Sequence, residues 1–469
     1  MPSKLRKLIG SRAFYAMVLA VVVPIIVQNA ITNFVNLLDN LMVGRIGTDQ
    51  FSGVAVANQL IYVFNLAVFG AVSGAGIFTA QYCGAGNLEG VRASCRYKLY
   101  AGLLLSVGAI ALFLLKGPEL VLLYLTDDSD PARVADTLHY GLQYLNIMLL
   151  GLPPFAFAQS YASTLRETGE TRLPMLAGII AVFVNLIFNF LLIYGKLGFP
   201  KLGVQGAAIA TVLSRYVELG IIAVYTHTHT RKHPFAEGLF RTLCIPRTVV
   251  REITHKGMPL LVNELLWSLG MATLNQIYSL RGLDVVAATN INTTVFNLFS
   301  VFFLSLGTAA AIIIGQDLGA NEVDTAVDHS GKMIAFSVVV SIFVGLELIA
   351  CSNAIPMLYD VLPSVRSLAS KLILVCACIM PFNAFCNCEY FILRSGGKTG
   401  ITFLFDCGFT WLVCIPLAYC LTHFTAMGVV MIFFCVHSMD AVKGVIGLVL
   451  VKKGVWIHNI VSGSDMQLS

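Results

Sequence analysis

The sequence alternates between long apolar stretches and short polar or charged connections along its whole length. Each apolar stretch has about 20 residues or more, and at ~1.5 Å per residue a helix of that length crosses a hydrocarbon core of ~30 Å. The pattern therefore predicts an all-α membrane protein. Its twelve expected spans are residues 13–42, 51–80, 99–124, 137–163, 173–195, 204–228, 257–280, 285–315, 332–358, 367–392, 401–422 and 428–451.

The first half of this pattern returns in the second half. When the sequence is shifted by 235 positions, Pro24 aligns with Pro259, Gln81 with Gln316, and Gly84 with Gly319. A period this long indicates duplication of a whole half and not a solenoid. We predict an N-terminal six-helix lobe at 1–228, a cytoplasmic interlobe loop at 229–256, a C-terminal six-helix lobe at 257–455 and a cytoplasmic tail at 456–469.

Composition and charge placement agree with a membrane protein. Hydrophobic residues make up 57% of the chain and charged residues 12%, so a water-soluble fold would leave much apolar surface exposed. Basic residues gather after the even-numbered spans, in the interlobe loop and at both ends, whereas the connection at 126–130 is acidic. By the positive-inside rule, both termini are expected on the cytoplasmic side of the plasma membrane.

One acid within a predicted span stands apart because no basic residue lies one helical turn from it. Counting inward from the outer boundary places this acid, Asp39, at a depth similar to those of Asn185, Asn189 and Thr211. Together they offer hard oxygen ligands that suit a small cation such as Na⁺, and a protonated Asp39 is the alternative loaded state. A packing network of satisfied polar groups would give the same pattern.

Two further features are candidates for a role in function. Pro24 lies about four turns from Asp39 on the same predicted helix, and a proline removes a backbone hydrogen bond and permits a kink, so Pro24 is a candidate hinge. In the second half, Asn263, Glu264 and Trp267 place an acid beside an aromatic ring, which suits an organic cation. An acid hydrogen-bonded to its neighbours would serve structure alone.

Other intramembrane charges have simpler explanations or none. Asp440 and Lys443 are three residues apart on one predicted helix and are expected to neutralise each other. Three more acids, Glu347, Glu389 and Asp406, receive no role from the sequence.

These motifs resemble the multidrug and toxic compound extrusion (MATE) transporters, in particular their bacterial branch. The resemblance rests on residues 39–47, 81–86, 165–171 and 203–208, with Asn185, Asn189, Thr211 and the repeat around Glu264. It implies two six-helix lobes forming a V around a central cavity, and export by alternating access driven by inward Na⁺ or H⁺. It also implies that Asp39, Asn185, Asn189 and Thr211 match the family's cation site, and that Glu264 matches its acid on helix seven. Where the family often has a second acid, this chain has Asn383.

The expected function is a cation-coupled antiporter that exports cationic amphipathic compounds, acting as a monomer in the bilayer. The alternative is a flippase for lipid-linked or oligosaccharide cargo, but an anionic cargo calls for intramembrane cations, and few are present. We expect no enzymatic activity, because the spans contain no phosphate loop, no His-Glu-x-x-His and no catalytic triad. No nucleic-acid partner and no cofactor beyond the coupling ion are expected.

Overall fold

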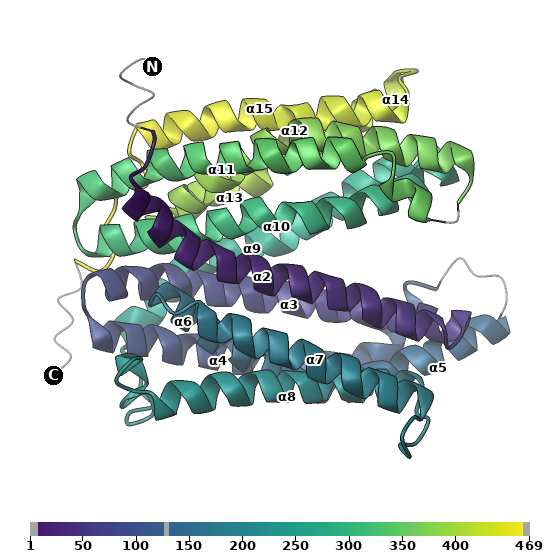
Figure 1. The fold of residues 1–469 in the computed structure, drawn as a ribbon, viewed down its shortest axis with the longest axis horizontal. Coiled ribbons are helices and arrows are strands. Elements are labelled where there is room, and N and C mark those ends of the chain that lie inside the picture. The colour runs from purple at the N-terminus through teal and green to yellow at the C-terminus, as the bar shows by residue number, and fades with distance from the viewer. Residues whose placement is uncertain (1–7, 126–130, 360, 463–469) are drawn as a thin grey trace. The chain divides into compact units, whose positions relative to one another are not determined.

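The computed structural model describes residues 8–125, 131–359 and 361–462, and within them every regular element is a helix. In chain order (Figure 1) these are α2 Arg12–Gly44, α3 Thr48–Gly84, α4 Leu88–Leu122, α5 Pro131–Met148, η1 Leu149–Gly151, α6 Leu152–Glu167, α7 Arg172–Tyr194, α8 Val204–Thr228, η2 Pro234–Ala236, α9 Arg247–Ser279, α10 Leu283–Gly319, α11 Val323–Cys351, η3 Ile355–Leu358, α12 Pro363–Ser395, α13 Thr399–Phe403, η4 Leu404–Gly408, η5 Thr410–Cys414, α14 Ile415–Phe424 and α15 Val429–Lys452. The all-α fold class is confirmed.

Eleven helices or continuous helical runs of the described chain are long and apolar enough to cross a membrane. They overlap eleven of the twelve predicted spans, although α4 begins at Leu88 and not at 99, and α11 covers Val323–Cys351 and not 332–358. The remaining helix, α9, begins at Arg247 and not at 257 as predicted, so the second part of the predicted interlobe loop is helical. This first part of α9 carries Arg251, Glu252 and Lys256, which extend the helix beyond its apolar segment.

The chain divides into two compact units. Unit 1 comprises Met1–Ile26, Ala80–Asn87 and His255–Ser469, and unit 2 comprises Val27–Thr79 and Leu88–Thr254. The predicted lobes divide the chain at one loop, whereas α2 and α3 each contribute residues to both units. Predictions that concern residues 1–7, 126–130 and 463–469 lie outside the described part of the chain.

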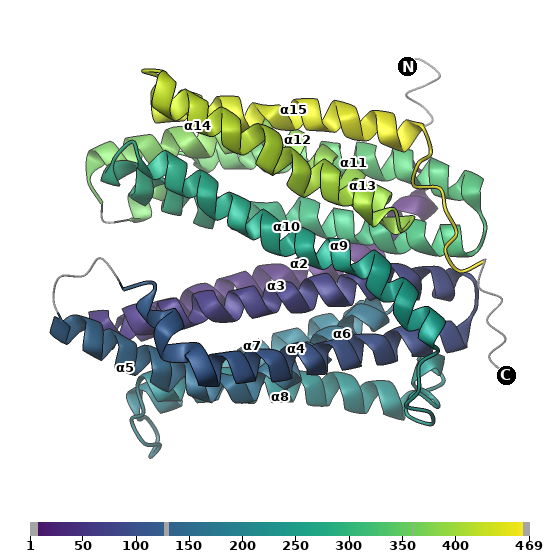
Figure 2. The ribbon, with the colours of Figure 1, turned by 180° about the vertical axis from the view of Figure 1, so that it is seen from behind.

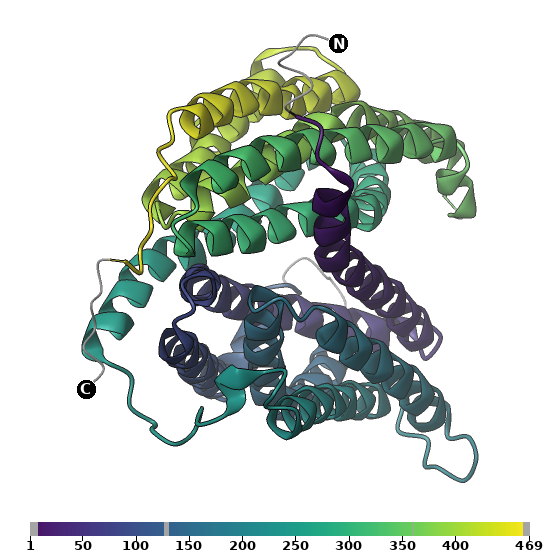
Figure 3. The same ribbon diagram turned by 60° about the vertical axis from the view of Figure 1, so that its left-hand side comes forward.

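In unit 2, α7 and α8 pack side by side (Figure 3), and α4 packs against α6. The core contains Phe64, Leu145 and Ile193 among other buried residues. Two basic residues of α4, which the charge pattern places outside the membrane, hold the loop around η2. Arg92 donates to the carbonyl of Phe235, and Arg96 donates to the carbonyl of Leu239 at 2.7 Å.

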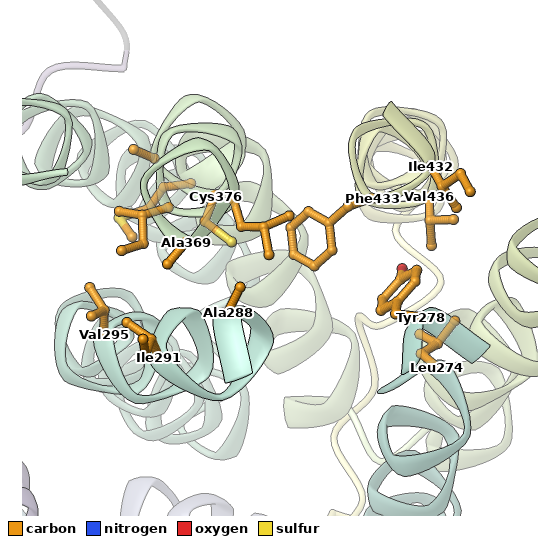
Figure 4. Close-up of a cluster of buried hydrophobic side chains, with 14 of the residues drawn as sticks. Leu274, Tyr278, Ala288, Ile291, Val295, Ala369, Cys376, Ile432, Phe433 and Val436 are labelled. Atoms are coloured by element: carbon orange, nitrogen blue, oxygen red, sulfur yellow. The ribbon is translucent and has the colours of Figure 1, made fainter. Parts of the chain in front are cut away.

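In unit 1, α12 packs against α10, α11 and α15, and Figure 2 shows the run from α13 to α14 beside them. Part of the core is drawn in Figure 4, where Tyr278 faces Phe433 with 5.5 Å between ring centroids. The α13 to α14 run is unusual because η4 and η5 are π-helical turns. Such turns rotate the following side chains relative to an α-helix, and they often occur at functional positions.

The repeated Gln-x-x-Gly motif forms a crossing of α3 and α10 within unit 1. A Cβ atom on Gly84 would overlap the backbone of Gln316, and one on Gly319 would overlap the backbone of Gln81. The fully buried Gln81 side chain donates to the carbonyl of Ser395 at 2.9 Å and accepts from the amide of Ile460 at 2.8 Å. The described part of the predicted tail, residues 456–462, therefore packs against unit 1.

Candidate functional site

Asp39 of α2 lies against α7 within unit 2. Asn189 Nδ2 donates to Asp39 Oδ1 at 2.5 Å, and Asn185 lies one turn before Asn189 on the same helix face. Thr211 of α8 completes the group, with its Oγ1 3.2 Å from the Asn185 amide and donating to the Ala207 carbonyl at 3.0 Å. The structure thus brings together the four polar residues that depth counting placed at one level.

The amide of Asn185 can point in either of two directions. With its nitrogen toward Thr211, its oxygen accepts from Asn189 and faces the two Asp39 carboxylate oxygens at 2.9 and 3.1 Å. With the amide reversed, its nitrogen donates to the carboxylate but faces the Asn189 nitrogen at 3.1 Å. Each orientation leaves one pair of like groups in contact, two acceptors in the first and two donors in the second.

The burial of the site is graded. Asn185 and Asn189 are buried, whereas Asp39 and Thr211 are half-buried. The Asn189 side-chain oxygen is buried and has no hydrogen-bond partner. The four side chains therefore bring together one carboxylate, two amide oxygens and one hydroxyl oxygen, and Asp39 is the one acid among them. Within the described residues no three His, Cys, Asp or Glu side chains gather as a metal site.

Pro24 lies inside α2, and its side chain is buried. The boundary between the units falls two residues later in the same helix, between Ile26 and Val27. Asp39 and Pro24 are therefore on one continuous helix but belong to different units. Pro259, the repeat partner of Pro24, lies inside α9.

The second group of predicted residues is part of a polar network within unit 1. Asn263 of α9 donates to Asp406 Oδ2 of η4 at 3.0 Å and to the Tyr390 hydroxyl of α12 at 3.3 Å. The Tyr390 hydroxyl donates in turn to Glu264 Oε1 at 3.3 Å. Lys443 Nζ of α15 closes the network on Asp406 Oδ1 at 2.7 Å.

Trp267 lies one turn beyond Glu264 on α9, and its side chain is 36% exposed. The indole is thus available at the surface of unit 1, while Asn263 is buried and Glu264 is half-buried. The three predicted residues therefore differ in their surroundings. Asn263 and Glu264 join the internal network, and Trp267 faces outward.

One residue of this network, Tyr390, and one pairing, Lys443 with Asp406, were not predicted from the sequence. Tyr390 carries no charge, and nothing in its sequence context indicates that it bridges Asn263 and Glu264. The pairing of Lys443 with Asp406 did have a signal, because the two residues lie at similar distances from the neighbouring helix ends, at ~1.5 Å per residue. Lys443 was instead expected to pair with Asp440 on its own helix.

Comparison with known proteins agrees with these features. The MatE family profile matches residues 24–191 and 259–420. The "Probable multidrug resistance protein NorM" of Thermotoga maritima is 24% identical over 414 residues, covering 86% of this chain and 85% of that protein. The "Probable multidrug resistance protein YoeA" of Bacillus subtilis is 26% identical, covering 86% of each chain.

A solved structure shares the fold. The outward-facing conformation of a multidrug resistance MATE family transporter of the MOP superfamily superposes with a TM-score of 0.84 at 18% identity, covering 97% of this chain and 98% of that one. The family profile matches more than half of the sequence, in two segments that coincide with the internal repeat. The chain therefore belongs to the MatE family of multidrug and toxic compound extrusion transporters.

Proposed function

We propose that the protein is a cation-coupled antiporter that exports organic, cationic amphipathic compounds across the plasma membrane by alternating access. The coupling ion, Na⁺ or H⁺, binds at Asp39 with Asn185, Asn189 and Thr211. The protein is proposed to act as a monomer, with both termini in the cytoplasm and without enzymatic activity. Membership of the family and the eleven membrane-crossing helices support this function.

The observation that carries the proposal is the hydrogen bonding around Asp39, where each orientation of the Asn185 amide leaves two like groups in contact. In the first orientation of Asn185, two acceptors face each other at 2.9 Å. A proton on Asp39 turns this contact into a hydrogen bond to the Asn185 oxygen, and a Na⁺ ion between the same oxygens would also satisfy it. In this orientation of Asn185 one added positive charge would satisfy the network, and this supports a proton or a Na⁺ ion at Asp39.

Binding of that charge must change the conformation for transport to be coupled to it. The position of Pro24 supports a hinge, because proline weakens the helix and lies two residues before the unit boundary. Asp39 is on the far side of this hinge. A change in the ion occupancy of Asp39 would then bias the direction of α2 beyond Pro24.

The proposed substrate class follows from the residues around Glu264. An acid and an exposed aromatic ring, Trp267, attract an organic cation through charge and through the ring quadrupole. Asn263 is proposed as the third residue of this substrate site, and it donates to the Tyr390 hydroxyl that in turn donates to Glu264.

The alternative cargo, an anionic lipid-linked compound, is less well supported. Two of the intramembrane cations that such a cargo would need, Lys443 and Arg215, already have partners. Lys443 is paired with Asp406, and Arg215 donates to the carbonyl of Gly151 at 3.1 Å and lies 4.9 Å from the centre of the Phe155 ring.

The proposed function is tested by efflux of a fluorescent organic cation from proteoliposomes, with a Na⁺ gradient and a pH gradient imposed separately. The expected result is export driven by one of the two gradients, and the effective gradient names the coupling ion. Liposomes without an imposed gradient are the control. Export that needs neither gradient would contradict antiport and favour the flippase.

A further inference from the structure

Glu389 of α12 is an acid to which the proposed mechanism gives no task. Its side chain is 0% exposed, and neither carboxylate oxygen has a hydrogen-bond partner. It points at Gly447 of α15, where an added Cβ atom would overlap Glu389 Oε2 and lie 3.0 Å from the Phe405 ring. The absence of a side chain at Gly447 is what makes room for this acid.

Lys443 of α15 acts electrostatically on Glu389, but it forms its ion pair with another acid. It lies one turn before Gly447 on the same face of α15. Its ammonium group is bound to Asp406 at 2.7 Å and lies 5.2 Å from the centre of the Phe405 ring. The ring of Phe405 is thus next to both Lys443 and the space that holds Glu389.

The other titratable groups on α12 and α15 do not neutralise Glu389. On α12 these are the buried thiols of Cys386 and Cys388, the Tyr390 hydroxyl, which donates to Glu264, and Arg394, which lies 5.4 Å from the centre of the Phe391 ring and acts electrostatically on Glu264. On α15 the group is the acid Asp440. The basic groups His329 and Lys332, in the first half of α11, are paired with acids. His329 lies 2.7 Å from Asp317, and Lys332 is paired with Asp328.

An ionised carboxylate in such a place would be left without donors, without water and without its own cation, which is far more costly than burying the neutral acid. We propose that Glu389 is a proton-binding site of unit 1, neutral in this conformation. In a conformation that admits water to the site, the proton leaves to water and the resulting carboxylate competes with Asp406 for Lys443, which keeps its charge throughout. The ion pair of Lys443 thereby reports whether Glu389 carries a proton. This proposal goes beyond the proposed function and depends neither on Asp39 nor on transport.

The test is infrared spectroscopy of the purified full-length protein at neutral pH in H₂O and D₂O, compared with Glu389→Gln. A neutral acid gives a carbonyl stretching band that is separate from the carboxylate bands and shifts on deuteration. The proposal predicts the loss of one such band in Glu389→Gln. The matched control is Glu322→Gln, at an exposed position at the start of α11, which should leave all of these bands in place.

A second variant keeps the test decisive if Glu389→Gln does not fold. In Gly447→Ala the new methyl group displaces the flexible end of Glu389, so the same band should shift in frequency. Loss of the band in the first variant or a shift in the second supports the site. If Glu389→Gln folds and retains every protonated-carboxyl band, or if Gly447→Ala leaves the spectrum unchanged, Glu389 is not the proton carrier and the proposal fails.

Discussion

Lys443 Nζ on α15 binds Asp406 Oδ1 on η4 at 2.7 Å, so its ion pair joins two helices. Spacing along the sequence favoured Asp440, three residues away on the same helix. The π-helical turn that contains Asp406 changes the direction of its side chain relative to an α-helix, and the partner oxygen Oδ2 accepts from Asn263. The carboxylate of Asp406 therefore connects α15 to α9, the helix that carries Glu264.

Removing Lys443 should destabilise unit 1. Both side chains of this pair are largely buried, at 12% and 17% exposure, so Lys443→Met leaves Asp406 without its cation and should cost about 3–5 kcal/mol. The double variant Lys443→Met with Asp406→Asn should recover much of that loss. Thermal unfolding in detergent measures both.

The control for this variant is Lys116→Met, which removes an exposed pair with Glu119 and should cost less than about 1 kcal/mol. Equal effects of Lys443→Met and Lys116→Met would contradict a structural role for the buried pair.

The crossing of α3 and α10 should be intolerant of any side chain at its glycines. In Gly319→Ala the new methyl group meets the backbone of Gln81, which cannot move without separating the helices, so a loss of about 1–3 kcal/mol is expected. Gly84→Ala should behave alike, because its position is equivalent in the repeat.

Gly108→Ala is the matched helical control for this crossing, because nothing lies within 4 Å of its added Cβ atom. A helical alanine there should stabilise the protein by roughly 0.5–1 kcal/mol. The melting temperatures of the three variants measure these changes in stability. A Gly319→Ala protein as stable as the unmodified protein would show that the close approach of α3 and α10 is not required.

Glu264→Gln should weaken binding of cationic drugs more than binding of neutral ones, since it removes a charge and keeps the shape of the side chain. Tyr390→Phe separates binding from positioning, because it keeps the charge of Glu264 and removes the hydroxyl that donates to Glu264 and accepts from Asn263. We expect a smaller loss for Tyr390→Phe, again confined to cations. Binding titrations with a matched cationic and neutral pair measure this, and an equal loss for both ligands would assign Glu264 a structural role.

The fold and one candidate site followed from regularities that sequence carries directly. Apolar length gave the spans, and counting along helices of opposite direction placed Asp39, Asn185, Asn189 and Thr211 at one depth. In the structure Asp39 contacts Asn189, Asn189 contacts Asn185, and Asn185 contacts Thr211. Whether they bind the coupling ion stays a prediction, since contact alone is compatible with packing.

The parts that were missed depend on contacts between segments far apart in the chain. Residues 8–26 and 80–87 belong to the same unit as the second half of the chain. Phe14, Val18 and Val22 share a core cluster with residues of that half, and Gln81 is held by the carbonyl of Ser395 and the amide of Ile460. No local periodicity encodes such bonds. No sequence pattern indicates the π-helical turns of η4 and η5, so the neighbours of Asp406 could not be predicted from helical spacing.

The central claim, that Asp39 binds the coupling ion, is tested most directly by gradient-driven efflux from proteoliposomes containing Asp39→Asn. We predict that this variant folds with an unchanged melting temperature and loses efflux under the gradient that drives the unmodified protein. The matched control, Asp49→Asn, removes another acid of unit 2, whose partner Arg133 lies 3.3 Å away at the surface, and should transport normally. Undiminished efflux by Asp39→Asn would contradict the account.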